Sequence, residues 1–484
     1  MFRATAFSIG SRAIQYSQMH NATLLQYQEQ ISSGLRLQRS SDDPISFRQV
    51  TSLRSRMSEL AADQRSISTT KSILSTSTVN VQEYADLINR AKSLALQGVQ
   101  ALDETERNAI ALEVDGLLSS LKNIASTQFD GNYVFAGRKA DVRPFDFNAP
   151  QIAGRSLEVA YSGSDRNSRA FVGESVSIDT FYDGQYVFSA PDRGSTVLLG
   201  PSGAVAGSGT DSMTGRATLS VIHRATTYSG ASGIQPGTGS AGNDTVIGNA
   251  GKHAVHIDDE SGDGSWGWIT LNNGAPVRYT NTDDNLEVKG ASGESVFVDT
   301  TSMTAGYNGV IDVVASGDLS VDGGTTTVAI DFSTNQVVTD PSTGGFVNVD
   351  STSIRLAADN YLEFPGTADA FQVLFELSED LKNTRGLGSN QYAESLNRRV
   401  GELERMSDHA FHVLGEQSTS LRTLEVLGLR IDELELSVET QLSEIQSTDI
   451  PEAVLRMENS RQLLEYTYAA TATISSIGLL NFLR

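Results

Sequence analysis

The sequence predicts an α+β protein in which both ends of the chain form one long antiparallel helical bundle, with a β-rich region inserted between its halves. Three observations lead to this prediction. Apolar residues recur at alternating three- and four-residue intervals over a long segment near each end. Between these segments the chain is rich in Gly, Thr, Ser, Val and Asp, with alternating apolar positions and frequent turn signals. Outside them, a stop signal and a restart signal separate a further helix at each terminus.

The N-terminal half of the predicted bundle is a helix whose apolar stripe runs from Val50 to Ile88. A three-four spacing sustained over this length is typical of a long helix in a coiled-coil-like seam. The polar residues Gln64, Lys71 and Thr78 fall on the stripe, where we expect them to fix the register of packing at a cost in stability. The stripe comprises Val50, Leu53, Met57, Leu60, Gln64, Ile67, Lys71, Leu74, Thr78, Val81, Ala85 and Ile88.

The C-terminal half of the bundle is predicted from a matching stripe between Leu396 and Ile445. Because the two stripes lie far apart in sequence but have similar lengths, antiparallel packing against each other is the simplest way to bury both. A further amphipathic helix is expected from Glu104 to Ser126. The second stripe comprises Leu396, Val400, Leu403, Ser407, Ala410, Leu414, Gln417, Leu421, Leu424, Gly428, Ile431, Glu435, Val438, Leu442 and Ile445.

The stretch "ISSGLRLQRSSDDPISF" ends one helix and begins the next. Gly34 supplies the left-handed residue that commonly terminates a helix. Asp43 then offers a capping acceptor, and Pro44 occupies the first helical position. The break predicts an N-terminal helix that is separate from the bundle helix.

A second restart, "STDIPEAVLRM", mirrors the first near the other end of the chain. Thr448 or Asp449 can cap the new helix, and Pro451 lies in its first turn. Glu452 stands three residues after Asp449, as in a capping box. The chain is therefore expected to divide into terminal arms at 1–40 and 450–484, a helical bundle built from 41–140 and 363–449, and a β-rich, solvent-facing region at 141–362.

The β-rich region contains two predicted hairpins and two runs of small polar residues. "WITLNNGAPVRY" predicts a hairpin around Asn273 and Gly274, and "LSVDGGTTTVAI" predicts another around Asp322 and Gly323. The runs "GSGTDSMTG" and "YSGASGIQPGTGSAGND" are typical of a long loop or linker. Such a linker would divide the region into two β modules.

Composition limits the classes of partner. The formal net charge of −23 argues against nucleic acid and anionic lipid as partners. The chain has no cysteine, so a disulfide framework or a thiolate metal site is excluded. No apolar stretch approaches a membrane span, so membrane insertion is not expected, and the start lacks the apolar region of a secretory signal. We therefore expect a cytoplasmic protein or one exported by a machine that does not read a cleavable signal.

Four sequence features resemble sites but do not predict chemistry. The glycines of "GTGSAG", residues 237–242, neither follow a plausible strand nor open a helix, so we expect a loop rather than a pyrophosphate site. Residues 259–264 match the start of a calcium loop, but Thr270 stands where the glutamate belongs, so a tight acidic turn is expected. His253 and His256 are predicted to point to opposite faces of a strand. The remaining histidines, His20, His223, His409 and His412, have no catalytic partner in local sequence.

These features leave no predicted catalytic, cofactor-binding or metal-binding residue. We therefore do not expect an enzyme, and no cofactor is implied.

The ends of the chain resemble the bacterial flagellin-like axial proteins. Ile31–Phe47 is similar to the flagellin segment that links the innermost helices of the filament to the next layer, and Ser475–Arg484 is similar to the leucine-rich tail of the family. Ile124–Phe145, with aromatic residues after its glycine, resembles the hook–filament junction branch, whereas flagellins more often have a lysine and leucines there. Val159–Phe188 resembles the first β segment of the same branch. Most of residues 190–360 match nothing that we can name.

The resemblance implies an inner layer of terminal helices, a helical outer layer and solvent-facing β modules. It implies a ring of identical subunits between hook-associated protein 1 and the flagellin filament, located outside the cell on the flagellum. It also implies export through the flagellar type III channel with a dedicated export chaperone. The apolar stripes of the arms are expected to find no intramolecular partner beyond each other and to become ordered against neighbouring subunits.

Other readings stay open at this point. A flagellin that polymerises into the filament itself is the nearest alternative. An adhesin or glycan-binding module in the acidic middle region belongs to a different class. An enzyme in that region lacks a recognisable nucleophile, metal set or phosphate loop.

Overall fold

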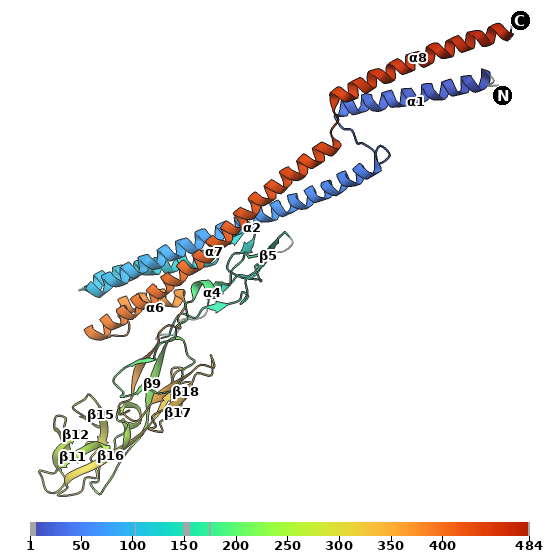
Figure 1. Ribbon diagram of the computed structural model, residues 1–484. Coiled ribbons are helices and arrows are strands. Elements are labelled where there is room, and N and C mark those ends of the chain that lie inside the picture. Colours follow the sequence, from blue (N-terminus) through green and yellow to red (C-terminus); the bar gives the residue numbers. More distant parts are fainter. Residues whose placement is uncertain (1–5, 102, 149–154, 174–175, 483–484) are drawn as a thin grey trace. The chain divides into compact units, whose positions relative to one another are not determined.

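The computed structural model describes residues 6–101, 103–148, 155–173 and 176–482. The chain forms two compact units, one from residues 1–72, 170–178 and 419–484 and the other from residues 73–169 and 179–418. Helices predominate at both ends and strands in the middle, as the sequence predicts (Figure 1). The finer division at residues 40, 140, 362 and 449 remains a prediction. The helices are α1 (Ala6–Ser33), α2 (Pro44–Gln100), α3 (Glu104–Ala125), α4 (Gly184–Phe188), α5 (Ser240–Asn243), α6 (Ala370–Leu381), α7 (Ser389–Gln446) and α8 (Ile450–Phe482).

Helices α2 and α7 lie side by side and run antiparallel, as predicted (Figure 1). In the larger unit, the amide of Gln417 donates to Ser77 at 2.9 Å and the Lys92 ammonium lies 2.5 Å from the Glu404 carboxylate. In the smaller unit, Gln64 Nε2 donates to the Asp432 carboxylate at 3.0 Å. Residues nearer the start of α2 contact residues nearer the end of α7. The two helices therefore run in opposite directions.

The predicted stripe on α7 is confirmed, because each of its residues is buried or half-buried. On α2 the apolar members of the stripe that repeat every seven residues, such as Leu74 and Val81, are buried. The prediction for the polar members is wrong at Lys71, which is exposed. The buried polar residues of α2 are instead Thr70 and Ser77, each one residue before the predicted stripe positions Lys71 and Thr78. An α-helix has 3.6 residues per turn, so a straight helix drifts against a seven-residue repeat and turns a neighbouring position toward its partner.

Shorter helices pack beside the long pair in the larger unit. Helix α3 covers the predicted segment and packs against α6. The Asp103 carboxylate caps α3 by accepting from the backbone N–H of Glu106 at 2.7 Å. Asp369 and Gln372 form a reciprocal capping box at the start of α6. Both helices therefore begin where local side chains satisfy their free N–H groups.

The segment Ile124–Phe145 supplies aromatic rings to a buried cluster. Phe135 and Phe145 lie edge-on to Phe188, with ring centroids 5.1 Å and 5.7 Å from its own. Tyr84 of α2 approaches the same ring at 5.0 Å, and Phe371 of α6 at 5.5 Å. The aromatic residues after the glycine of this segment thus join α2, α4 and α6 in one core.

The middle of the chain folds around one eight-stranded sheet. Its long strands are antiparallel and carry apolar residues on the face that packs inward. In spatial order its strands are β13 (Val277–Thr280), β12 (Trp266–Leu271), β11 (Gly248–Asp258), β16 (Asn308–Ser320), β9 (Gly215–Tyr228), β20 (Ala358–Phe364) and β7 (Val197–Leu199), with β17 (Val328–Ala329) paired to β16. The predicted hairpins are confirmed as β12–β13 and β16–β17.

In the part of the chain that the structure describes, five small sheets are found besides the large one. They are β1 (Gln128–Phe129) with β2 (Asn132–Tyr133), β3 (Phe145–Asp146) with β4 (Ala160–Tyr161), β5 (Arg169–Val172) with β6 (Val176–Asp179), β10 (Gln235–Pro236) with β15 (Ser295–Asp299) and β14 (Leu286–Lys289), and β18 (Gln336–Thr339) with β19 (Phe346–Asp350) and β8 (Val205–Ala206).

The large sheet carries two apolar cores, but the predicted linker does not separate them. Strand β16 contributes Val313 to one core and Leu319 to the other. The run that contains "GSAGND" packs onto the sheet, with Ile234, Ser240 and Asp244 all buried. The linker prediction is therefore wrong, because these small polar residues have hydrogen-bonding partners, such as the Asp244 carboxylate, which accepts from Ser240 and from the backbone of Phe297.

A buried ion network joins the sheet to the helices. Glu363 of β20 accepts hydrogen bonds from Arg385 at 2.6 Å and Arg398 at 2.7 Å. Arg399 of α7 contacts the same carboxylate at 3.3 Å. The cationic groups around Glu363 hold its pKa well below the usual range despite burial, which alone would raise it. The network comprises Arg216, Glu363, Glu376, Asp380, Arg385, Arg398, Arg399 and Glu402.

Candidate assembly surface on the terminal helices

Helices α1 and α8 lie side by side and pack through a seam of mostly small or polar residues (Figure 1). The shielded positions follow a three-four spacing on both helices, as in a coiled coil. The small residues of such a seam let the two backbones lie close together. Its members include Ala13, Ser17, His20, Leu24 and Tyr27 on α1 and Ala453, Met457, Ser460, Leu464 and Thr467 on α8.

Large apolar side chains of the same helices point away from this seam. Leu455 is 66% exposed and Tyr466 is 70% exposed. A groove of about 490 Å³ between the helices is lined by Tyr16, Leu463 and Tyr466, among others. An apolar surface of this kind on a soluble protein marks a site of protein interaction. The exposed set is Ile14, Tyr16, Met19 and Leu25 on α1 and Val454, Leu455, Leu463, Tyr466 and Tyr468 on α8; we call it the arm surface.

The break between α1 and α2 lies at the predicted residues. Gly34 follows the last residue of α1 with φ +72°, the left-handed conformation that glycine adopts without strain. The Asp43 carboxylate accepts from the backbone N–H groups of Ile45 at 3.1 Å and Ser46 at 3.2 Å. Hydrogen bonds from the Ser46 side chain and backbone lower the pKa of Asp43. Helix α2 begins immediately afterwards at Pro44.

At the break between α7 and α8, the structure shows which of the two predicted residues caps α8. Asp449, rather than Thr448, accepts from the backbone N–H of Glu452 at 3.1 Å. The Glu452 carboxylate bonds to Arg456 one turn later. Asp449 is therefore the N-cap of α8, and Glu452 supports the first turn through an i,i+4 ion pair.

The two breaks are hydrogen-bonded to each other. Leu35 and Ser447 form an antiparallel β-bridge. The Arg36 N–H donates to the Gln446 carbonyl at 2.8 Å, and the Thr448 N–H donates to the Gly34 carbonyl at 2.9 Å. We call this bridge the terminal crossing. Sequence reasoning missed it, because partners so far apart leave no local periodic signal.

The acidic turn and the histidine pair adopt the conformations that the sequence predicts. The Asp259 carboxylate accepts from the N–H groups of Ser261, Gly262, Gly264 and Gly306, at 2.7–3.1 Å, so the predicted acidic turn is confirmed. His253 is buried and His256 exposed, on opposite faces of β11 as predicted.

The prediction for "GTGSAG" is wrong in both respects, since the segment follows the short strand β10 and Ser240–Asn243 forms the one-turn helix α5. The Asn285 side chain occupies the space beside Gly239 and accepts from its N–H at 2.7 Å. Over the residues that the structure describes, no group of three His, Asp or Glu side chains is placed to hold a metal ion, and no helix is long and apolar enough to cross a membrane.

Residues 9–140 match the family described as the bacterial flagellin N-terminal helical region. This part of the chain belongs to that flagellin family. The match includes most of α1, the first break and all of α2 and α3. Helix α1, which carries four of the nine arm-surface residues, is therefore a flagellin-type helix.

Curated relatives include both hook-associated and filament core proteins. The chain is 32% identical over 126 residues to flagellar hook-associated protein 3 of Salmonella typhimurium, covering 24% of this chain and 38% of the relative. It is 26% identical over 148 residues to the flagellar filament 30.7 kDa core protein of Treponema maltophilum, covering 30% and 49%. The chain thus spans less than half the length of these relatives.

Among solved structures, the chain is similar to flagellar hook-associated protein 3 from Legionella pneumophila, with 15% identity and a TM-score of 0.43, covering 82% of this chain and 99% of that one.

Proposed function

We propose that this protein is a structural subunit of the bacterial flagellum that forms the junction between hook-associated protein 1 and the flagellin filament, as a ring of identical subunits. The arm surface is the observation that carries the proposal. Helices α1 and α8 pack against each other through mostly small or polar side chains and present a set of large apolar side chains outward. Neighbouring axial subunits are the partners that would cover this apolar surface.

Two further observations support the proposal. The N-terminal helices belong to the flagellin family, and hook-associated protein 3 of Escherichia coli is among the relatives, at 31% identity over 143 residues. An exposed apolar arm surface also suits a dedicated export chaperone that shields it before passage through the flagellar type III channel. The protein would then reside outside the cell, on the flagellum.

A filament subunit is the second candidate, because relatives named as filament core proteins match over a similar length. The two functions differ in copy number and position. Gold labelling of the protein on isolated flagella should mark the border of hook and filament once per flagellum. Label along the filament would favour the flagellin function instead.

Removal of residues 451–484 tests the role of the arm. We expect the truncated protein to be folded and exported but to leave hooks without filaments, so that flagellin appears in the medium and the cells do not swim. Normal filaments on such cells would contradict the proposal. Export is checked by detecting the truncated protein in the medium, which separates an assembly defect from an export defect.

A further inference from the structure

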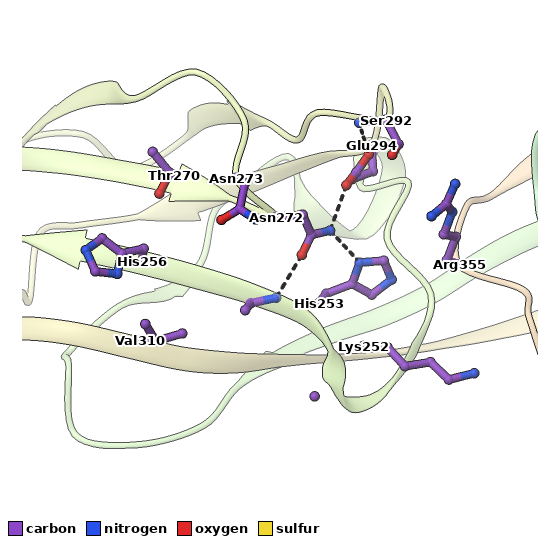
Figure 2. A pocket seen from close by; sticks show the side chains of 12 residues that line it. Lys252, His253, His256, Thr270, Asn272, Asn273, Ser292, Glu294, Val310 and Arg355 are labelled. Atoms are coloured by element: carbon purple, nitrogen blue, oxygen red, sulfur yellow. Dashed lines mark hydrogen bonds between the residues drawn. The ribbon is translucent and has the colours of Figure 1, made fainter.

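A polar cleft of about 630 Å³ opens in the β-rich region, where β11 and the turn after β12 meet the loop before β20 (Figure 2). This volume is in the range of small-molecule binding sites. Most of the side chains that line the cleft are polar or charged. A ligand for this cleft must therefore be recognised by hydrogen bonds and charge.

The floor of the cleft is a preorganised hydrogen-bond network. His253 Nε2 lies 2.6 Å from the Ile247 carbonyl oxygen, which can only accept, so Nε2 carries the proton. His253 Nδ1 then accepts from the amide nitrogen of Asn272 at 2.9 Å. The same nitrogen donates its second proton to Glu294 at 2.7 Å, and Asn272 Oδ1 accepts from the N–H of Ala254 at 2.9 Å.

Every hydrogen-bonding group of the Asn272 side chain is therefore used, as Figure 2 shows. The backbone places it there, because Asn272 and Asn273 have φ values of 45° and 59°, typical of a tight hairpin turn. Burial lowers the pKa of His253 and keeps the ring in this neutral form. The floor is rigid and leaves the groups above it free to contact a ligand.

Two cations line the cleft without a carboxylate partner. Over the part of the chain that the structure describes, neither Lys252 nor Arg355 forms an ion pair, whereas Arg155 and Arg224 pair with Asp340 at 3.0 Å and Asp318 at 2.5 Å. Lys252 instead donates to the Thr352 carbonyl and lies over the Phe332 ring. Both cations lie on the same side of His253 (Figure 2).

The single carboxylate of the cleft does not neutralise them both. Glu294 is 3% exposed, and its oxygens accept from Asn272 and from the backbone N–H of Ser292 at 3.0 Å. In a chain of net charge −23, two cations beside one buried carboxylate create a local site for an anion.

The open face of the sheet continues from the cleft. Thr270 and His256 are paired across β12 and β11, and both line the cleft. Trp268 precedes Thr270 by two residues, which puts it on the same face, and it is 38% exposed. Hydroxyl, imidazole and amide groups pair with sugar hydroxyls, while an exposed indole can stack on the apolar face of a pyranose ring.

From this juxtaposition we infer that the cleft binds an acidic saccharide, a pyranose that carries a carboxylate. The carboxylate would contact Arg355 and Lys252, with Arg355 able to bind it through two parallel hydrogen bonds. The sugar hydroxyls would bond to Asn273, Thr270 and His256, and the next sugar would lie toward Trp268. This inference is independent of the junction function.

The test is calorimetric titration of the full chain with trigalacturonate, maltotriose and acetate. We expect saturable binding of trigalacturonate, with maltotriose and acetate each at least about tenfold weaker, because each lacks one of the two recognised features. Equal binding of maltotriose, tighter binding of acetate, or no binding of trigalacturonate up to about 10 mM would each overturn the inference.

Three variants assign the site. Arg355→Gln should weaken trigalacturonate binding about tenfold, through loss of a charge-assisted hydrogen bond. Arg224→Gln makes the same charge change on β9, away from the cleft, and should leave binding unchanged. Equal effects of the two substitutions would overturn the inference. Trp268→Ala should weaken trigalacturonate but not acetate, and a matched melting temperature checks that each variant is folded.

Discussion

The terminal crossing and the joint between the sheet and the helices connect parts of the chain in opposite ways. At the crossing, Leu35 and Ser447 form a short antiparallel β-bridge, and most of the surrounding residues are exposed or half-buried. At the joint, four arginines and four carboxylates lie together, all of them buried except Arg385 and Arg398, which are half-buried. Each charged group of the joint is stabilised by several others, whereas the crossing is held by local helix caps and the short β-bridge.

This difference indicates two kinds of connection. A buried ion network adds little net stability over an apolar core, but it strongly penalises any arrangement that leaves an ion unpaired. The joint is therefore suited to hold one arrangement of sheet and helices. We expect the crossing, built from caps and a short bridge, to let α1 and α8 order or loosen without disturbing the long helices.

The largest expected effect is at the joint. Arg399→Ala should lower the free energy of unfolding by about 3–5 kcal/mol, because buried Glu402 would lose its cation and buried Glu376 would keep only Arg216, at 3.5 Å. Urea denaturation of the full chain measures this loss. Arg430→Ala, at an exposed position of the same helix, is the matched control and should change stability by less than about 0.5 kcal/mol. A small loss for Arg399→Ala would show that the joint tolerates unpaired charge.

A second prediction concerns the seam of α2 with α7. Ile67→Asp should cost about 3 kcal/mol or more, since it removes a buried apolar side chain and places a carboxylate in its position. Lys71→Asp lies one turn away at a predicted stripe position that is exposed, and it should cost less than about 0.5 kcal/mol. If denaturant melts show similar losses of unfolding free energy for both variants, Lys71 lies in the seam, as the sequence predicts.

The joint should also make stability depend on pH in the acid range. The pKa of Glu363 is lowered by its arginine partners, so its stabilising effect is present above the unfolded-state value of about 4.3 and is lost as pH falls through and below it. This one group can contribute up to about 1.4 kcal/mol per pH unit in that window. Glu363→Gln should flatten the decline in melting temperature below pH 4.5, whereas Glu444→Gln, at an exposed position of α7, should not.

The sequence was sufficient where the signals are local. Gly34, Asp43 and Pro44 end and start helices through their own backbone preferences, and the structure has the break at these residues. The antiparallel pairing of α2 and α7 followed from two stripes that each needed a partner. The positions of the polar seam residues could not be predicted in this way, because a seven-residue repeat does not define which of two neighbouring residues a straight helix turns inward.

Features made by distant residues were beyond sequence reasoning. Arg216, Glu363 and Arg399 are ordinary charged residues until the fold brings them together, and their spacing carries no pattern. The cleft likewise depends on Lys252 and Arg355 arriving from separate segments. The linker prediction failed for the same reason, because composition alone does not reveal the hydrogen-bonding partners that hold small polar residues in place.

The smallest expected effect tests whether the crossing separates α8 from α7. Asp449→Ala removes the cap of α8 and should weaken that helix by about 1 kcal/mol, whereas Asp449→Asn keeps an acceptor and should cost less. Hydrogen exchange can resolve this locally, as about a fivefold faster exchange of amides in the first turns of α8. If the crossing isolates the arms, amides of α7 between Leu403 and Ile431 should exchange as in the unaltered chain. If both helices accelerate equally, α7 and α8 open as one unit, and the contrast between the crossing and the joint would not hold.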